Sequence, residues 1–382
     1  MLKGEVKALH YLDNSATTAV SPGAARKALE MMTEIYANPS SLHSFGIRAE
    51  REVEAARKII AAQLGASEEE LLFTSGGTEA NNLALFGVAE ANRRRRKKIV
   101  ISSVEHSSVI EAARKLEDDG FTVVRIPPRS DGIIHPADVA AAVDSDTALV
   151  SVMLVNNETG AVMPVAEIFE EAREENPQVL CHTDAVQAFG KMNVRVKRLG
   201  ADLLTVSAHK VHAPKGCGAL YIKKGVRLVP RQYGGEQQKK RRPGTEAAPN
   251  IAAFGAACEE FDIAANLEKV RALCACAKER LLSIEGVALN SPENALPYVL
   301  NISAGRVRSE TMLHYLAERE IYLSSGSACA KGKPSHVLGA MGYDNDRADS
   351  ALRISFSKYN TKEDIDALAQ ALAEGLRELA HR

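Results

Sequence analysis

Seven short runs rich in aliphatic and β-branched residues alternate with helix-like segments between residues 71 and 224. Strand, helix and strand in this rhythm predict a mostly parallel sheet with helices on both faces. Because ligands of such sheets bind beyond the carboxyl ends of the strands, we expect the chemistry where each run ends. The runs are LLFTS (71–75), KIVISS (98–103), FTVVRIP (121–127), ALVSVMLV (148–155), VLCHTDAV (179–186), LLTVSAH (203–209) and GALYIKK (218–224).

The rest of the chain follows a helical pattern more than a strand pattern. Residues 47–65 form an amphipathic repeat closed by Gly65, and residues 251–286 form one long helical stretch. We therefore predict an α/β fold: a large domain over residues 16–255 with a mostly parallel seven-stranded sheet flanked by helices, and a smaller α+β domain made of residues 1–15 and 256–382. Short strands precede a last helix, for which Thr361 is the expected N-cap and whose expected buried side chains are Ile365, Leu368, Leu372, Leu376 and Leu379.

Composition excludes several classes of protein. The 48 Lys and Arg residues nearly balance the 49 Asp and Glu residues, so no strong field attracts nucleic acid. No apolar run approaches the ~18 residues of a membrane helix, and the N-terminus lacks the apolar core of a secretory signal. Six cysteines in 382 residues do not make a disulfide framework. We expect a cytoplasmic protein with reduced thiols, and neither membrane nor direct nucleic-acid binding.

Polar clusters follow the first, second and fourth of the predicted strands. Gly76-Gly77-Thr78-Glu79 comes after the first, where glycines opening into a helix leave free amides suited to a phosphate group. His106 follows the second strand and Asn156-Asn157 the fourth. Taken singly, the glycine and asparagine clusters read simply as turn chemistry, and a lone histidine at such a position is more often structural.

An acidic residue and a lysine follow the next two strands. Asp184 is costly to bury unless it meets a cation. Lys210 comes directly after Ser207 and His209, and an enclosed lysine becomes a Schiff-base nucleophile readily. A lysine, an aspartate for a ring nitrogen and a glycine turn for a phosphate are what a pyridoxal phosphate enzyme requires.

Two further patterns concern histidine and cysteine. A zinc site built on His182, His209 and His212 is the competing interpretation, but these residues lack zinc-ligand spacing and no C-x-x-C pair is present. Cys329 differs from the cysteines in apolar runs, because it lies in a small, polar segment with Lys331 and Lys333 nearby. Such surroundings favour an accessible thiolate.

Taken together, these motifs resemble those of the cysteine desulfurases, a group of pyridoxal phosphate enzymes of fold type I in the class V aminotransferase family. The resemblance extends over essentially the whole chain, from residue 11 to residue 361. The matching stretches are YLDNSATT (11–18), NPSSLHSFG (38–46), TSGGTEANN (74–82), EHSSV (105–109), NNETG (156–160), HTDAVQ (182–187), SAHKVHAPKG (207–216), GGEQQKKRRPGTEAAPNI (234–251), SSGSAC (324–329) and LRISFSKYNT (352–361).

The resemblance implies a role for each matching residue. Lys210 would hold the cofactor through its amine and His106 would stack on the pyridine ring and assist proton transfer. Asp184 would pair with the ring nitrogen, while Gln187 and Asn157 would contact the side of the ring that bears the hydroxyl. The phosphate would be bound by Gly77, Thr78, Ser207 and His209, with Thr245 reaching it from a second subunit, and the substrate carboxylate by Arg353 with help from Asn14.

The implied reaction converts L-cysteine to L-alanine and leaves the sulfur on Cys329 as a persulfide. The expected partners are L-cysteine, a second copy of the chain and a sulfur-acceptor protein, either an iron–sulfur scaffold or a tRNA-thiolation protein. No intrinsic metal is expected, although Cys329 could ligate an iron–sulfur cluster transiently. Three alternatives stay open: a selenocysteine lyase, an aminotransferase, and a sulfur carrier with a vestigial site. The presence of Lys210, Asp184 and His106 argues against the sulfur carrier.

One departure from the housekeeping branch of the family lies beside the predicted nucleophile. Only Ala330-Lys331-Gly332-Lys333 separates Cys329 from Pro334, where members of that branch carry a longer loop. The SSGSAC context still resembles the housekeeping branch. A shorter loop bears on which acceptors a persulfide can reach.

Overall fold

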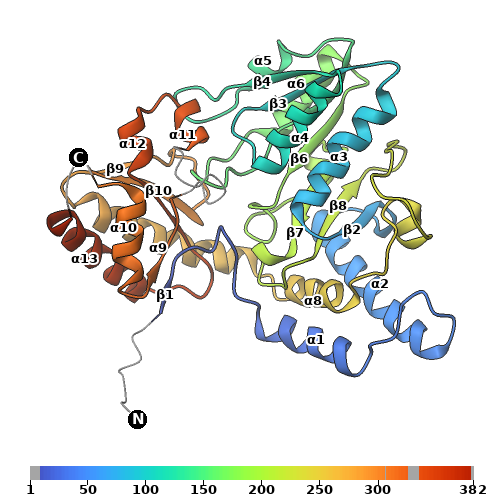
Figure 1. The fold of residues 1–382 in the computed structure, drawn as a ribbon, viewed down its shortest axis with the longest axis horizontal. Helices are drawn as coiled ribbons and strands as arrows, with labels where there is room; N and C mark the ends of the chain where they lie inside the picture. The colour runs from blue at the N-terminus through green and yellow to red at the C-terminus, as the bar shows by residue number, and fades with distance from the viewer. Residues whose placement is uncertain (1–8, 306, 326–334, 380–382) are drawn as a thin grey trace.

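The computed structural model describes residues 9–305, 307–325 and 335–379, which form two lobes (Figure 1). The larger lobe holds a seven-stranded sheet and the helices around it. The smaller lobe holds the elements that follow α8 (Ala248–Glu259), together with the N-terminal strand β1 (His10–Tyr11). The chain therefore begins in the smaller lobe, enters the larger one and returns.

The central sheet has the strand order β2-β8-β7-β6-β5-β3-β4. Strand β8 is antiparallel to both of its neighbours and every other pair is parallel, which confirms the mostly parallel seven-stranded sheet. Each strand lies within one of the seven predicted runs or overlaps it. The strands are β2 (Leu71–Thr74), β3 (Lys98–Ser102), β4 (Thr122–Ile126), β5 (Thr147–Ser151), β6 (Leu180–Asp184), β7 (Leu203–Ser207) and β8 (Gly218–Ile222).

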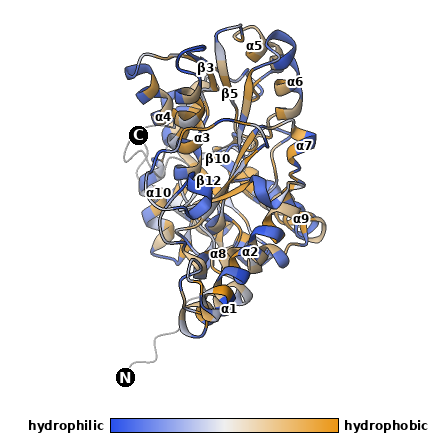
Figure 2. Ribbon diagram, turned by 90° about the vertical axis from the view of Figure 1, so that its right-hand side faces the viewer, coloured by the Kyte–Doolittle hydropathy of each residue, from blue (hydrophilic) through white to orange (hydrophobic). Residues whose placement is uncertain are grey.

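Helices cover both faces of this sheet because side chains alternate along each strand. Ile99 and Ile101 of β3 pack with α3 and α4 in one apolar cluster, whereas Val100 joins the cluster formed with α2, α6 and α8. Figure 2 shows the apolar residues concentrated in the strands between these layers. The helices of this lobe are α1 (Pro22–Thr33), α2 (Ser44–Leu64), α3 (Gly77–Asn92), α4 (Ser107–Asp118), α5 (Pro136–Ala140), α6 (Val165–Glu175), α7 (Val196–Leu199) and α8, with short 3₁₀ turns at Glu68–Glu70, Ala208–Lys210 and Gln237–Lys240.

The smaller lobe contains an antiparallel sheet of order β12-β10-β9 and a parallel pair of β1 with β11. Its strands are β9 (Val287–Leu289), β10 (Val299–Ala304), β11 (Ile321–Tyr322) and β12 (Ala351–Ser355). Two long helices, α9 and α13, lie against each other beside this sheet. The helices here are α9 (Ile263–Leu282), α10 (Ser309–Ala317), α11 (His336–Ala340), α12 (Asn345–Asp349) and α13 (Lys362–Glu378).

Helix ends test the sequence predictions directly. Gly65 ends α2 in the left-handed conformation (φ 66°), and Thr361 starts α13 with a capping box, both as predicted. The prediction of a single long helix over residues 251–286 is wrong. The chain forms two helices there, α8 and α9, because the Asp262 side chain accepts the Ala265 N–H and caps a new helix. Leu376 and Leu379, predicted to be buried, are only half-buried.

The boundary predicted between residues 255 and 256 falls inside α8, which packs on α1 and α2. That division of the chain therefore stays a prediction. Within the described part of the chain, no helix combines the length and the apolar character needed to cross a membrane.

Candidate active site

Four neighbouring strands of the large sheet, β7, β6, β5 and β3, run parallel and end at one edge. Ser207 is the last residue of β7 and Asp184 the last of β6. His106 follows β3 as the N-cap of α4, and Asn157 follows β5. The order of the strands therefore brings residues that are up to about a hundred positions apart in the sequence to a single edge of the sheet, as the alternating pattern predicted.

Asp184 is a buried carboxylate held by two N–H donors. It is 5% exposed, and its Oδ2 accepts from Asn81 Nδ2 at 2.7 Å while its Oδ1 accepts from the Val186 amide at 2.9 Å. Hydrogen bonds to an anionic acceptor are strong and fix its direction. Asn81, on α3, was not recognised from the sequence, since a single asparagine inside a helix gives no signal of this role.

His106 hydrogen-bonds through its Nδ1 to Ser108, at 2.8 Å from the hydroxyl oxygen and 3.2 Å from the amide nitrogen. Burial lowers the pKa of this imidazole, and the nearby cations Lys210 and Arg353 lower it further, against the opposing effect of Asp184. The ring is therefore held in its neutral form beside the strand ends.

Lys210 lies in the 3₁₀ turn directly after β7, with its amine turned toward the N-terminal segment. Its Nζ donates to the carbonyls of Ser15 and, at 2.8 Å, of Ala16. Gln187 donates from Nε2 to the same Ser15 carbonyl at 3.0 Å. Residues 15 and 16 thus fix both the predicted Schiff-base lysine and one of the predicted ring contacts.

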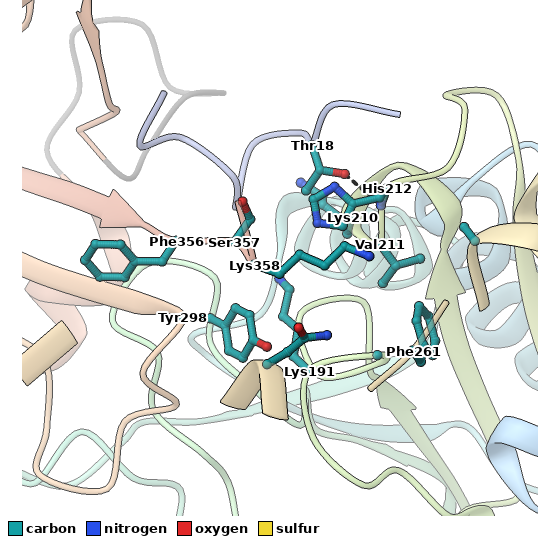
Figure 3. Close-up of a pocket in the computed structure, with 13 residues that line it drawn as sticks. Thr18, Lys191, Lys210, Val211, His212, Phe261, Tyr298, Phe356, Ser357 and Lys358 are labelled. Atoms are coloured by element: carbon teal, nitrogen blue, oxygen red, sulfur yellow. Dashed lines mark hydrogen bonds between the residues drawn. The ribbon is translucent and has the colours of Figure 1, made fainter. Parts of the chain in front are cut away.

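A second lysine, Lys191, is buried beside the first. Its Nζ donates to Gln187 Oε1 at 2.9 Å, and it lines one pocket with Lys210, Tyr298 and Lys358 (Figure 3). Burial lowers the Lys191 pKa to about 7, and the charges of Lys210 and Arg353 act in the same direction. Lys191 was not recognised from the sequence, because nothing in its local pattern distinguishes a buried lysine from an exposed one.

The predicted phosphate contacts surround the start of α3. A Cβ built on Gly77 would lie 3.7 Å from Ser207 Cβ and 3.1 Å from Val186, so the glycine turn faces the end of β7 closely. Ser207 Oγ is buried and has no hydrogen-bond partner among the described residues. A buried hydroxyl without a partner, facing helix N-terminal amides, fits a phosphate group. Thr78 is exposed on the same first turn.

His209 lies beside this turn and contacts the N-terminal segment. Its Nδ1 is 3.2 Å from Thr17 Oγ1. Burial lowers its pKa to about 4, with Lys210 and Lys215 contributing, so the ring is neutral at neutral pH. The role of His209 toward a phosphate stays a prediction.

Arg353, on β12, brings the smaller sheet to the same place. It is 3% exposed, donates from NH2 to Asp13 at 2.8 Å and from NH1 to the Asn157 carbonyl at 3.1 Å, while its Nε is buried without a partner in the described residues. An arginine with an unused donor at this position fits a carboxylate ligand. Asp13 was not recognised from the sequence.

Asn14 and Thr245 are placed less directly at the site. The side-chain nitrogen of Asn14 donates to the Ser355 carbonyl at 2.9 Å and to Asn360 Oδ1 at 3.1 Å, which ties the N-terminal segment to the smaller lobe. Thr245 is exposed in the segment before α8. A role for either residue in binding stays a prediction.

Cys329 lies outside the described residues, between two segments that contact the site. Ser324 pairs with Arg353 through backbone hydrogen bonds, and the Ser335 hydroxyl donates to the buried carboxylate of Glu158. Two of the cysteines in apolar runs are buried in the core as expected: burial raises the pKa of Cys181 and Cys217 to about 12. His182, considered as a zinc ligand, lies instead between the hydroxyls of Ser151 and Thr205.

These features define a class of enzyme. A lysine, an aspartate and a histidine at the strand ends, with an unpaired buried hydroxyl facing a glycine turn, form a site suited to pyridoxal phosphate. The residues present fit this cofactor at both ends, the Asp184 carboxylate for the ring nitrogen and the α3 N-terminus for the phosphate.

Known proteins identify the family. The model of the aminotransferase class-V family matches residues 10–368. A cysteine desulfurase IscS of Methanosarcina thermophila is 41% identical, covering 97% of this chain and 92% of that protein. Among solved structures, a NifS-like protein superposes with a TM-score of 0.93 at 35% identity, covering 97% of this chain and all of that one, and SspA in complex with cysteine has a TM-score of 0.82 at 34% identity, covering 92% and 100%. The chain belongs to the class-V aminotransferase family, within its cysteine desulfurases, which use pyridoxal phosphate.

Proposed function

We propose that the protein converts L-cysteine to L-alanine and takes up the sulfur on Cys329 as a persulfide. The observation that carries the proposal is the convergence of Lys210 and Arg353 on one N-terminal segment, through Ser15 and Asp13 respectively. An amino acid bound there can present its amine to the lysine and its carboxylate to the unpaired Nε of the arginine. The related SspA structure contains cysteine, which supports this choice of amino acid.

Bound pyridoxal phosphate supplies an electron sink for the negative charge that develops at the substrate Cα. Lys210 is placed to take the Cα proton, and Arg353 would hold the substrate carboxylate. The Cys329 thiolate attacks the substrate sulfur, and the bond between that sulfur and the substrate Cβ breaks. Cβ keeps the electron pair and gains a proton, and the product leaves as alanine. The two sulfur atoms are joined as a persulfide, and because the substrate carbon takes up the two electrons that they lose, no external oxidant is needed.

The persulfide sulfur then passes to an acceptor protein by attack of an acceptor thiolate. In support of Cys329 as the carrier of that sulfur, the described flanks of its segment hydrogen-bond to Arg353, at Ser324, and to Glu158, the residue after Asn157, at Ser335. Because only four residues separate Cys329 from Pro334, we propose that the acceptor approaches the site closely. An iron–sulfur scaffold and a tRNA-thiolation protein are the two acceptor types to test.

The protein is also proposed to act as a homodimer, with Thr245 completing the phosphate contacts of the neighbouring subunit. Large apolar side chains are exposed on α1 and in the loop after it, including Met32, Tyr36 and Leu42. A surface that gathers several large exposed apolar side chains fits an interface with another chain. Ser40 of that loop lines a depression together with Glu246, the neighbour of Thr245, so the two features adjoin.

The test measures sulfide and alanine released from L-cysteine with dithiothreitol, for the wild type, Cys329→Ala and Cys276→Ala. We expect equal amounts of both products from the wild type, at least about a hundredfold less from Cys329→Ala, and no change for Cys276→Ala, a half-buried thiol on α9. Undiminished sulfide and alanine from Cys329→Ala would overturn the persulfide route and show that another thiol, such as dithiothreitol itself, takes up the substrate sulfur. If the wild type and both variants bind the cofactor but release no sulfide, the proposed reaction is wrong and amino-group transfer should be tested.

A further inference from the structure

Within the described residues, the His106 ring makes its hydrogen bonds through Nδ1 alone, and both are to Ser108. The Ser108 backbone N–H, at 3.2 Å, can only donate. Nδ1 must therefore be an acceptor without a proton, and a neutral ring then carries its proton on Nε2.

The Ser108 hydroxyl is oriented in the same sense by a second residue. Its oxygen lies 2.8 Å from His106 Nδ1 and accepts from Asn81 Nδ2 at 2.9 Å. With Asn81 donating to the oxygen, the hydroxyl proton is left for the histidine nitrogen. Ser108 is 7% exposed, so water competes little for either bond.

The orientation of the Asn81 amide is set in turn by a carboxylate. Asn81 Nδ2 donates to Asp184 Oδ2 at 2.7 Å, which uses its second proton. The reversed amide would place two acceptor oxygens, Asn81 Oδ1 and Asp184 Oδ2, against each other. Asn81 Oδ1 is buried and has no partner in the described chain, so nothing rewards the reversed orientation.

We propose that Asp184, Asn81 and Ser108 form a relay that fixes His106 as the neutral imidazole protonated on Nε2, with Ser108 acting as a positioning residue. The proposal rests on the proposed function and deepens it, because it assigns the form of His106 that works above the cofactor ring. The carboxylate that pairs with the ring nitrogen thereby also sets the histidine proton.

Protonation of His106 meets a specific obstacle in this arrangement. An imidazolium carries a proton on both ring nitrogens, so its Nδ1–H would face the Ser108 backbone N–H and would require the Ser108 hydroxyl to turn its own proton away. Other groups around the ring add to or oppose this effect, and the titratable and charged groups that face His106 from the surrounding elements are Glu105, Asp184, His209, Lys210, His336 and Arg353.

A purely structural interpretation is that His106 only caps α4 by accepting the Ser108 amide. The two interpretations differ in what the hydroxyl contributes, because Ser108→Ala keeps the backbone donor and the cap. Ser107→Ala is the matched control, since it removes the same group one position earlier on the helix. Ser108→Thr restores a hydroxyl at the relay position.

The test follows the His106 ring nitrogens by ¹⁵N NMR in holoenzyme labelled at histidine, with His106→Asn used for assignment. We expect the Nε2–H form in the wild type, a rise of about half a pH unit or more in the His106 pKa in Ser108→Ala, recovery in Ser108→Thr and no change in Ser107→Ala. The acid limb of kcat/KM should move with the NMR value.

An Nδ1–H ring in the wild type, or a Ser108→Ala pKa equal to that of Ser107→Ala, would overturn the relay. The wild-type spectrum decides the first point even if Ser108→Ala does not fold. The His106 tautomer is measured without turnover. An Nε2–H ring in a protein that releases no sulfide would therefore contradict the proposed function and still support the relay.

Discussion

The two halves of the site are built in different ways. On the large sheet, Asp184 and His106 are positioned by Asn81 and Ser108, which come from the helices packed on the same strands. On the small sheet, Arg353 depends on Asp13, 340 positions away in sequence. The first half is a product of one sheet topology, whereas the second requires that three distant segments meet. Substitutions should therefore separate cofactor chemistry from substrate binding.

The largest expected effect is that of Lys210→Ala, which removes the amine from the large-sheet half. Turnover of L-cysteine should fall by about a thousandfold or more, because Lys210 supplies the amine that takes the Cα proton and the neighbouring Lys191 is hydrogen-bonded to Gln187. The predicted phosphate contacts at the start of α3 and the Asp184 carboxylate remain, so the variant should still bind pyridoxal phosphate, without the covalent bond. Turnover and the visible absorption of the bound cofactor measure the two effects. Activity within tenfold of the wild type would show that Lys191 or another base replaces it.

Arg353→Lys should give a smaller and more selective loss. Lysine is a point charge and cannot keep the contacts to Asp13 and to the Asn157 carbonyl while offering a further donor to a carboxylate. KM for L-cysteine should rise about 10- to 100-fold, with the cofactor content unchanged. Steady-state kinetics and absorption spectra check the two parts.

The control for that change is Arg347→Lys, in the same lobe. Arg347 hydrogen-bonds Asn290 and the Leu289 carbonyl, and among the described residues its side chain has no hydrogen bond to a residue placed at the site. Its replacement should leave KM unchanged. Loss of cofactor from Arg353→Lys, in place of a raised KM, would break the separation between the two halves.

The same difference explains how far the sequence could predict the molecule. Strand ends follow from local patterns, so Asp184, Ser207 and Lys210 were expected at one edge and are found there. Asn81 and Asp13 were not, because their bonds to Asp184 and Arg353 join residues 103 and 340 positions apart. The split between α8 and α9 was missed for a local reason, since the Asp262 cap competes with an otherwise continuous helical repeat.

Glu105 allows a finer test of the large-sheet half. It is fully buried beside His106, and its Oε1 accepts from the Ser102 hydroxyl at 2.6 Å and from the Met153 amide at 2.7 Å. Its Oε2 has no partner in the part of the chain described. Burial raises its pKa to about 8, with the two hydrogen bonds opposing the shift and Asp184 adding to it. The carboxyl is therefore protonated at neutral pH.

Glu105→Gln should consequently change the pH dependence of stability more than stability itself. A carboxyl whose pKa is raised on folding contributes stability that is complete below pH 4.5, its unfolded value, and is lost as the pH rises to about 8. Glutamine mimics the protonated form and does not titrate. The stability of the variant relative to the wild type should therefore increase across this window, by at most about 1.4 kcal/mol per pH unit.

Chemical denaturation at several pH values measures this trend, with Glu170→Gln, an exposed position on α6, as the control. A constant difference between Glu105→Gln and the wild type from pH 5 to 8 would show that the carboxyl is ionised in the folded protein. A negative charge would then lie against Asp184, and the large-sheet half would have to contain a balancing cation. A rising difference means that this half is assembled around a neutral carboxyl, which leaves Asp184 as the anion available to the cofactor ring.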